Sequence, residues 1–203
     1  MNIGFIIYDE VTALDFIGIF DPISRIKTMG IDNSIFIDIC GYGEKVKDFS
    51  GEIKFLSKKV RPSLDNYDVI VLPGGFGTRK LEKDKEFISW IKTANPCATF
   101  VSVCSGALIL GAAGKINGKT ITTHKNLFKE IKKYGCIVKD ERIVFDGNLI
   151  TARGVTSAID LGLFLCGAFY GIENMKLIAK QMDYEISKNV LEILIDYKLH
   201  RKS

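Results

Sequence analysis

The stretch TFVSVCSG at residues 99–106 carries the strongest structural signal in the chain. Its first five residues are uncharged and mostly β-branched or aromatic, which is typical of a strand covered on both faces in a parallel sheet. Small residues then surround Cys104, and Ala and Leu continue in a helical pattern until Gly114. A small-x-nucleophile-x-Gly pattern between a strand and a helix is typical of a nucleophile elbow. We therefore expect Cys104 to be exposed on a sharp turn from strand to helix.

Apolar runs and helical patterns alternate on both sides of this stretch. Buried strands are predicted at residues 2–8, 34–40, 68–72 and 99–103, and shorter strands within 45–60 and at 120–123, 136–139, 142–145 and 149–152, the last two joined by a hairpin turn at 146–148. Helices are predicted at 14–26, 81–92, 105–113 and 155–170, with further helical patterns from 174 onward. This alternation predicts one α/β domain over residues 1–203, with a mostly parallel central sheet and helices on both faces.

Composition places the chain among globular proteins and excludes several function classes. It has 203 residues, of which 47% are hydrophobic and 26% charged. The 28 basic and 24 acidic residues give a net charge of +4, which is too mild to predict nucleic-acid binding. A short basic end contains Lys198, His200, Arg201 and Lys202.

Cysteine usage and the apolar segments predict a cytoplasmic protein that binds no membrane and no metal. The N-terminus lacks a basic start, and Asp9 and Glu10 interrupt its apolar run, so no signal peptide is expected. The longest uncharged run, at 98–114, is short for a membrane span. The five cysteines are odd in number and have no zinc-binding spacing, which favours a reducing compartment.

Three chemically suggestive features fall at or just beyond predicted strand ends. They are Asp15, the loop Pro73-Gly74-Gly75 and Cys104. In a parallel α/β sheet the ligand site lies outside the carboxyl ends of the strands. We therefore expect these three features to meet in one site.

Cys104 is the candidate nucleophile. At a helix N-terminus the partial positive charge favours a thiolate and is expected to lower the pKa of the thiol. The amide of Ser105, together with an amide of the glycine loop, is placed to form an oxyanion hole. The alternatives are that Cys104 is a small buried core residue and that the glycine loop is only a turn.

Asp15 lies among apolar residues, where a carboxylate is unfavourable without a partner or a task. Burial is expected to raise its pKa, so that it can pass a proton to the thiolate or the substrate. The alternative is that Asp15 is a helix N-cap. Of the two histidines, His200 lies in the basic end, and His124 either reaches the site or only bonds to a neighbouring loop.

As a set, five motifs resemble those of the ThiJ/PfpI superfamily of cysteine hydrolases and lyases. They are Leu14-Asp15, Leu72-Pro73-Gly74-Gly75, Val103-Cys104-Ser105-Gly106, Thr122-Thr123-His124 and Ile150-Thr151-Ala152-Arg153-Gly154. The resemblance implies a flavodoxin-like three-layer sandwich and a homodimer. It also implies that Cys104 is the nucleophile, Asp15 the acidic residue beside it, and the amides of Gly75 and Ser105 the oxyanion contacts.

Within the superfamily, the Leu-Asp and Thr-Thr-His motifs are most similar to the isonitrile hydratase branch. The peptidase branch has a histidine where this chain has Ser105, and the glyoxalase and deglycase branch usually has a glutamate where it has Asp15. Residues 171–203 are too short for the DNA-binding helices that some related regulators carry.

The resemblance therefore implies an enzyme in which Cys104 attacks the terminal carbon of an isonitrile, Asp15 manages the proton, and water releases an N-substituted formamide. No cofactor is implied, and the partner is a small electrophilic substrate. One alternative directs the same nucleophile at a reactive aldehyde. Another, from a different class, makes Cys104 a redox sensor or the protein a regulatory ligand binder.

Overall fold

The structure is a computed structural model and describes residues 1–200. Within these residues the main sheet has seven strands in the order β10-β11-β7-β6-β1-β2-β5. Neighbouring strands run parallel, except for the antiparallel pair β10 and β11 at one edge. The strands are β1 (Asn2–Ile7), β2 (Phe36–Gly41), β5 (Lys59–Val60), β6 (Val69–Leu72), β7 (Thr99–Val103), β10 (Ile143–Asp146) and β11 (Leu149–Ala152).

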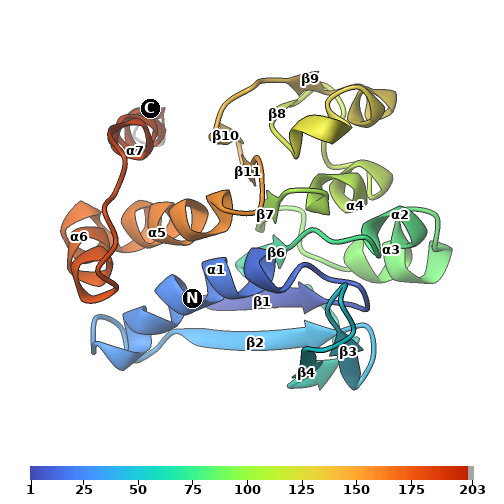
Figure 1. Ribbon diagram of the computed structural model, residues 1–203, viewed down its shortest axis with the longest axis horizontal. Coiled ribbons are helices and arrows are strands. Elements are labelled where there is room, and N and C mark those ends of the chain that lie inside the picture. The colour runs from blue at the N-terminus through green and yellow to red at the C-terminus, as the bar shows by residue number, and fades with distance from the viewer. Residues whose placement is uncertain (201–203) are drawn as a thin grey trace.

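Helices cover both faces of this sheet, which confirms the predicted α/β sandwich with a mostly parallel sheet. Figure 1 shows α1 and α5 side by side on one face and α2, α3 and α4 grouped on the other. The first face is covered by α1 (Ala13–Thr28), α5 (Ser157–Tyr170), α6 (Ile172–Gln181) and α7 (Lys188–His200). The second is covered by α2 (Thr78–Leu81), α3 (Lys85–Ile91) and α4 (Gly106–Ala112).

The central strands are apolar on both faces because each face supports a separate core. In β1, Phe5 and Ile7 contribute to the core under α1 and α5, whereas Ile6 contributes to the core under α3 and α4. Successive side chains of a strand point to opposite faces, so a doubly covered strand has no polar alternation. Burial of this apolar surface is the main favourable contribution to folding.

The helix predicted over 81–92 is confirmed as α3, although it begins later than expected, at Lys85. A separate short helix, α2, ends at Leu81. Asp84 separates them as the N-cap of α3, and its carboxylate accepts hydrogen bonds from the amides of Glu86 and Phe87. A capping aspartate satisfies amides that lack a partner in the first turn, so it starts a new helix here.

Residues 120–139 pack against α4 and β10 and share the core under α3 and α4. The strands predicted at 120–123 and 136–139 are present but short, as β8 (Thr120–Ile121) and β9 (Ile137–Val138), and they pair with each other. Two short 3-10 helices, η1 (Lys125–Leu127) and η2 (Glu130–Tyr134), lie between them and were not predicted. A second small sheet, β3 (Lys45–Lys47) and β4 (Lys54–Leu56), forms within the predicted stretch of exposed strands.

The predicted turn at residues 146–148 is confirmed, because β10 and β11 pair across it. His200, expected in the basic end, is the last residue of α7 and packs against Phe145. Arg201 and Lys202 of that end lie outside the described residues. Among residues 1–200, the helices are all too short or too polar to cross a membrane.

Candidate active site

Cys104 occupies the predicted elbow between β7 and α4. Its φ of +56° lies in the left-handed region, which is uncommon for a residue with a side chain and is found at functional turns. A Cβ atom at position 106 would lie 2.1 Å from the Leu72 carbonyl oxygen, so only glycine fits where α4 begins against β6. These two constraints explain why the sequence has small residues around Cys104.

Asp15 approaches the elbow from the first turn of α1. It is fully buried, and its Oδ2 atom accepts a hydrogen bond from the Gly74 amide at 3.0 Å. Thr12 is the N-cap of α1, so the interpretation of Asp15 as a helix cap is wrong. Among residues 1–200, no donor bonds to the Oδ1 atom of Asp15, although the Cys104 thiol lies close enough to lower the pKa of the carboxyl. A buried carboxyl oxygen in this position favours the protonated form of the acid.

Gly74 lies against both Asp15 and the elbow. A Cβ atom at this position would lie 2.7 Å from Asp15 Oδ2, 2.7 Å from the Ser105 amide nitrogen and 2.8 Å from Cys104 Cβ. Such distances are far below van der Waals contact, so a side chain at Gly74 would push Asp15 away from the elbow. The glycine loop after β6 therefore allows α1 and the elbow to meet, and the three features predicted at strand ends do lie together.

The electrostatics of the pair differ from the prediction for Cys104. Burial raises the pKa of Asp15 to about 7, against the hydrogen bond from Gly74, which lowers it. Burial, and next the negative charge of Asp15, raise the pKa of Cys104 to about 12. The prediction that the helix N-terminus would lower this pKa is wrong. Desolvation and a neighbouring carboxylate outweigh the amide of Ser105, which does act in the predicted direction.

The pair therefore holds at least one proton near neutral pH, because both pKa values are raised for the same reason. The two groups interact directly, and protons on such a pair belong to the pair rather than to either residue. Tyr8 stands beside them, and its hydroxyl donates to the Pro73 carbonyl. Burial and the charges of Asp15 and Cys104 also raise the pKa of Tyr8, so it stays neutral.

The two amides expected to stabilise a charged intermediate both face the elbow. The Ser105 amide lies close enough to the Cys104 sulfur to lower the pKa of the thiol. The Gly75 amide donates to Ser105 Oγ at 2.9 Å, and this hydroxyl donates to the Gly75 carbonyl at 3.1 Å. Gly75 has a φ of +147°, a conformation that side chains rarely adopt. Thr78 Oγ1 also donates to the Gly75 carbonyl, at 2.7 Å, and so fixes the loop.

Cys104 opens into a cavity of about 460 Å³. The residue is buried, with 8% of its surface exposed, so the expectation of an exposed cysteine at the elbow is wrong, although Cys104 still lines the cavity. His124 lines the same cavity, which answers whether it reaches the site, but its Nδ1 atom accepts from the Asn126 amide at 3.2 Å and caps η1. No bond joins His124 to Cys104 among the described residues. The cavity is lined by Thr12, Phe49, Gly75, Phe76, Thr78, Arg79, Cys104, Ser105, His124, Asn126, Leu127 and Val155.

Sequence reasoning missed several residues of this site. Tyr8 follows β1 directly, and a polar residue at the carboxyl end of a central strand could have indicated it. Thr123, whose hydroxyl donates to the Cys104 carbonyl at 2.6 Å, lies within a motif that had been noted without a role. Phe49 and Arg79 come from peripheral segments, and no local pattern marks them.

The fold and the site together define an α/β sandwich protein with a cysteine at a nucleophile elbow and a buried acid beside it. A family model described as the DJ-1/PfpI family matches residues 1–167. The chain belongs to this family, which confirms the resemblance found in the sequence.

Curated relatives point to the same family. The chain is 31% identical over 188 residues to isonitrile hydratase of Pseudomonas putida, a match that covers 91% of this chain and 78% of that protein. It is 30% identical over 119 residues to protein DJ-1alpha of Drosophila melanogaster, covering 58% of this chain and 55% of that protein.

Solved structures agree with the fold. A ThiJ/PfpI family protein from Pseudomonas syringae superposes with a TM-score of 0.81 at 26% identity, covering 92% of this chain and 76% of that one. DJ-1 of Schizosaccharomyces pombe superposes with a TM-score of 0.77 at 21% identity, covering 91% of this chain and all of that one. The predicted flavodoxin-like fold is therefore confirmed.

Proposed function

We propose that the protein is a hydratase that adds water to an isonitrile and releases an N-substituted formamide. The observation that carries the proposal is the buried contact between Cys104 and Asp15, in which both pKa values are raised. Addition to an isonitrile carbon requires a nucleophile and a proton at the same atom, and this pair supplies both. The similarity to isonitrile hydratase supports the same reaction.

In the first step the Cys104 sulfur bonds to the terminal carbon of the isonitrile. The thiol proton moves through the Asp15 carboxyl to the same carbon, which gives a covalent thioimidate with no net loss of atoms. A raised thiol pKa is compatible with this chemistry, because the proton that leaves sulfur is the one that carbon needs. Asp15 lies within reach of the thiol, which allows the transfer in a water-poor site.

In the second step water attacks the thioimidate carbon. Asp15 accepts a proton from the water and delivers it to the substrate nitrogen. The tetrahedral adduct then collapses: its hydroxyl proton passes through Asp15 to the sulfur, the carbon–oxygen double bond forms, and the carbon–sulfur bond breaks. The products are the formamide and the free protein, so the reaction consumes only isonitrile and water.

We assign the amides of Ser105 and Gly75 to the polar substrate atoms. The Ser105 amide already faces the sulfur, and the Gly75 amide is held by the Ser105 hydroxyl at 2.9 Å. Preorganised backbone amides stabilise developing negative charge without moving. In this proposal they bind the substrate nitrogen and the oxygen that comes from water.

The test is the conversion of an isonitrile to its formamide, followed by chromatography or NMR. The wild type is expected to turn over, and Cys104→Ala is expected to lose turnover while keeping its circular dichroism spectrum and melting temperature. Cys97→Ala is the matched control, since Cys97 is exposed and lies outside the cavity. Formamide production by Cys104→Ala would refute the proposal.

The aldehyde alternative uses the same nucleophile, and supplying methylglyoxal and an isonitrile to one preparation separates the two reactions. The redox-sensor alternative is disfavoured by the raised pKa of Cys104, because thiolates oxidise faster than thiols. Mild peroxide followed by peptide mass spectrometry tests it. Preferential oxidation at Cys104 over exposed Cys97 would support sensing.

Three wider expectations stay predictions: a homodimer, a cytoplasmic location, and one domain across the chain. Sedimentation equilibrium measures the first directly. A single cooperative unfolding transition, seen by both tryptophan fluorescence and circular dichroism, is the expected result for the third.

A further inference from the structure

Two exposed aromatic rings form one wall of the Cys104 cavity. Phe49 comes from the loop between β3 and β4, and Phe76 follows Gly75 directly. Their rings meet edge to face with centroids 5.7 Å apart. They are 52% and 68% exposed, so each retains apolar surface that a ligand can cover. Covering such surface is favourable by roughly 25 cal/mol per Å².

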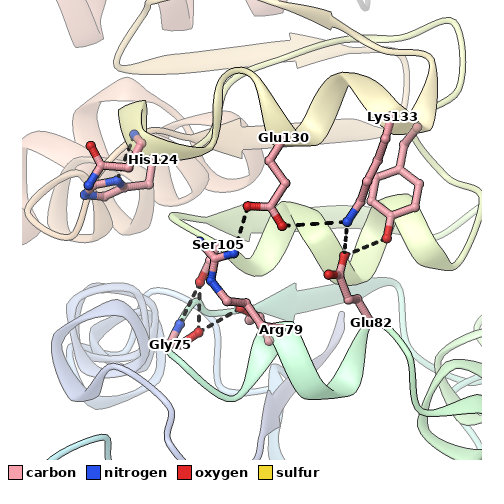
Figure 2. A network of polar contacts seen from close by, with 10 residues as sticks. Gly75, Arg79, Glu82, Ser105, His124, Glu130 and Lys133 are labelled. Carbon is pink, nitrogen blue, oxygen red and sulfur yellow. Dashed lines mark hydrogen bonds and ion pairs between the residues drawn. The ribbon is translucent and has the colours of Figure 1, made fainter.

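A second part of the cavity lining carries an ion pair instead of a free charge. Among the described residues that line the cavity, Arg79 is the one with a permanent charge. Its guanidinium bonds to Glu130 at 2.7 Å, and Glu130 lies 3.7 Å from Lys133. Lys133 in turn bonds to Glu82 at 2.8 Å, and Figure 2 shows this chain of contacts running from Arg79 to Glu82.

This network keeps Arg79 from acting as an anion receptor. A guanidinium that already holds a carboxylate offers a second carboxylate little attraction, since Glu130 repels it. The network also holds Glu130 in place, because the Tyr134 hydroxyl and Lys133 both bind Glu82 and so anchor η2 to α2. The four side chains of the network together carry no net charge.

We propose that the substrate carries an uncharged aromatic or aliphatic substituent, which packs against Phe49 and Phe76 while the Arg79–Glu130 pair leaves carboxylate-bearing substrates unfavoured. This inference rests on the proposed function. Phe49 and Phe76 are specificity-determining residues, and Glu130 is a positioning residue that acts through Arg79.

Alkylation of Cys104 tests the inference without requiring turnover. Three probes that share one leaving group are used: iodoacetamide, N-benzyl iodoacetamide and iodoacetate. Peptide mass spectrometry measures labelling at Cys104 relative to exposed Cys97, which corrects for intrinsic reactivity. The benzyl probe is expected to give the highest ratio and iodoacetate the lowest.

Substitutions then test the aromatic part and the ion-pair part of the cavity lining individually. Phe49→Ala and Phe76→Ala are each expected to lower the benzyl ratio about fivefold without changing the iodoacetamide ratio. Phe36→Ala is the matched control, because Phe36 is 62% exposed at the start of β2, away from the strand ends that form the site. The assignment of Phe49 and Phe76 as the substrate-binding wall would be refuted by an unchanged labelling ratio for the benzyl probe. A changed oligomeric state in either cavity variant would refute it as well.

Glu130→Gln frees Arg79 and is expected to raise the iodoacetate ratio about fivefold. Glu173→Gln makes the same change of charge on α6, outside the cavity lining, and is expected to have no effect. An unchanged labelling ratio for iodoacetate in Glu130→Gln would refute the claim that the Arg79–Glu130 pair disfavours carboxylate-bearing substrates.

Steady-state hydration distinguishes failure of this inference from failure of the proposed function. With benzyl isonitrile, Phe76→Ala is expected to raise KM and leave kcat close to wild type. If labelling follows the predicted pattern but no isonitrile is hydrated, the binding assignment stands and the reaction is wrong. If isonitriles are hydrated but KM for the benzyl substrate is unchanged in Phe76→Ala, the substrate class is wrong.

Discussion

The Gly75 amide donates to Ser105 Oγ at 2.9 Å, so the hydroxyl beside Cys104 holds an amide of the glycine loop in place. This contact joins two segments that are 30 residues apart. Ser105 therefore has a second role besides being the small residue that an elbow requires, because its hydroxyl fixes the glycine loop. The loop amide is preorganised by a side chain that the substrate must share or displace.

Ser105→Ala is expected to remove this partner and leave the buried Gly75 amide unsatisfied. The Gly75 carbonyl keeps its bond from Thr78, so the loss is confined to the amide. We expect the free energy of unfolding to fall by about 1–2 kcal/mol in urea, with a lower kcat/KM. Ser105→Thr keeps the hydroxyl and is expected to retain both. Equal loss in the two variants would contradict this role of the hydroxyl.

Asp15→Asn is expected to stabilise the protein increasingly as the pH rises. The pKa of Asp15 is raised from 3.8 to about 7, so the folded state binds its proton more tightly than the unfolded state. The resulting stability is fully present below pH 4 and is lost as the pH rises through 7. Relative to wild type, the variant is expected to gain about 2–4 kcal/mol between pH 4 and 8.

Urea unfolding of both proteins across this pH range measures that difference and cancels the other titrating groups. The variant is also expected to lose isonitrile hydration, because an amide cannot transfer the proton. A stability difference that is independent of pH would show that Asp15 titrates normally in the folded protein.

The reactivity of Cys104 should also respond to Asp15. Burial and then the Asp15 charge raise its pKa to about 12, so the wild-type thiol is expected to alkylate slowly at pH 9. Asp15→Asn removes the charge and is expected to increase the rate of labelling by iodoacetamide about tenfold at that pH. Cys97 in the same sample provides the reference rate. If the alkylation rate of wild-type Cys104, plotted against pH, had its midpoint below pH 7, the raised pKa would be contradicted.

Gly74→Ala tests the close packing of the site. The added Cβ would meet Asp15 and the elbow at 2.7–2.8 Å, so we expect kcat/KM to fall at least about 100-fold. Gly43→Ala is the matched control, since the nearest atom to its added Cβ is 3.6 Å away. Activity assays and melting curves compare the two. Full activity in Gly74→Ala would show that the packing tolerates displacement.

The elbow could be predicted from the sequence because its causes are local. The left-handed turn at Cys104 and the close approach of Gly106 to Leu72 both require small residues at fixed positions. The central strands were also predictable, since burial on both faces leaves continuous apolar runs. The start of α3 was placed too early because the cap at Asp84 was overlooked, although it is a local signal.

The electrostatics of the site could not be predicted in the same way. A helix N-terminus is visible in a sequence, but the burial of Cys104 and its distance from Asp15 depend on how α1 packs against the glycine loop. These tertiary effects reverse the sign of the expected pKa shift. Phe49 and Arg79 line the Cys104 cavity from peripheral segments for the same reason, because only the folded chain brings them to it. Glu130 is linked to the cavity through its ion pair with Arg79.

The most direct measurement is the mass of the Cys104 peptide after the protein is mixed with an isonitrile and quenched with acid. A thioimidate adds the whole mass of the isonitrile to this peptide, and we expect this adduct to appear before the formamide and to decline as substrate is exhausted. Formamide that accumulates without any adduct on Cys104, or that forms equally well when the thiol is absent, would contradict the account.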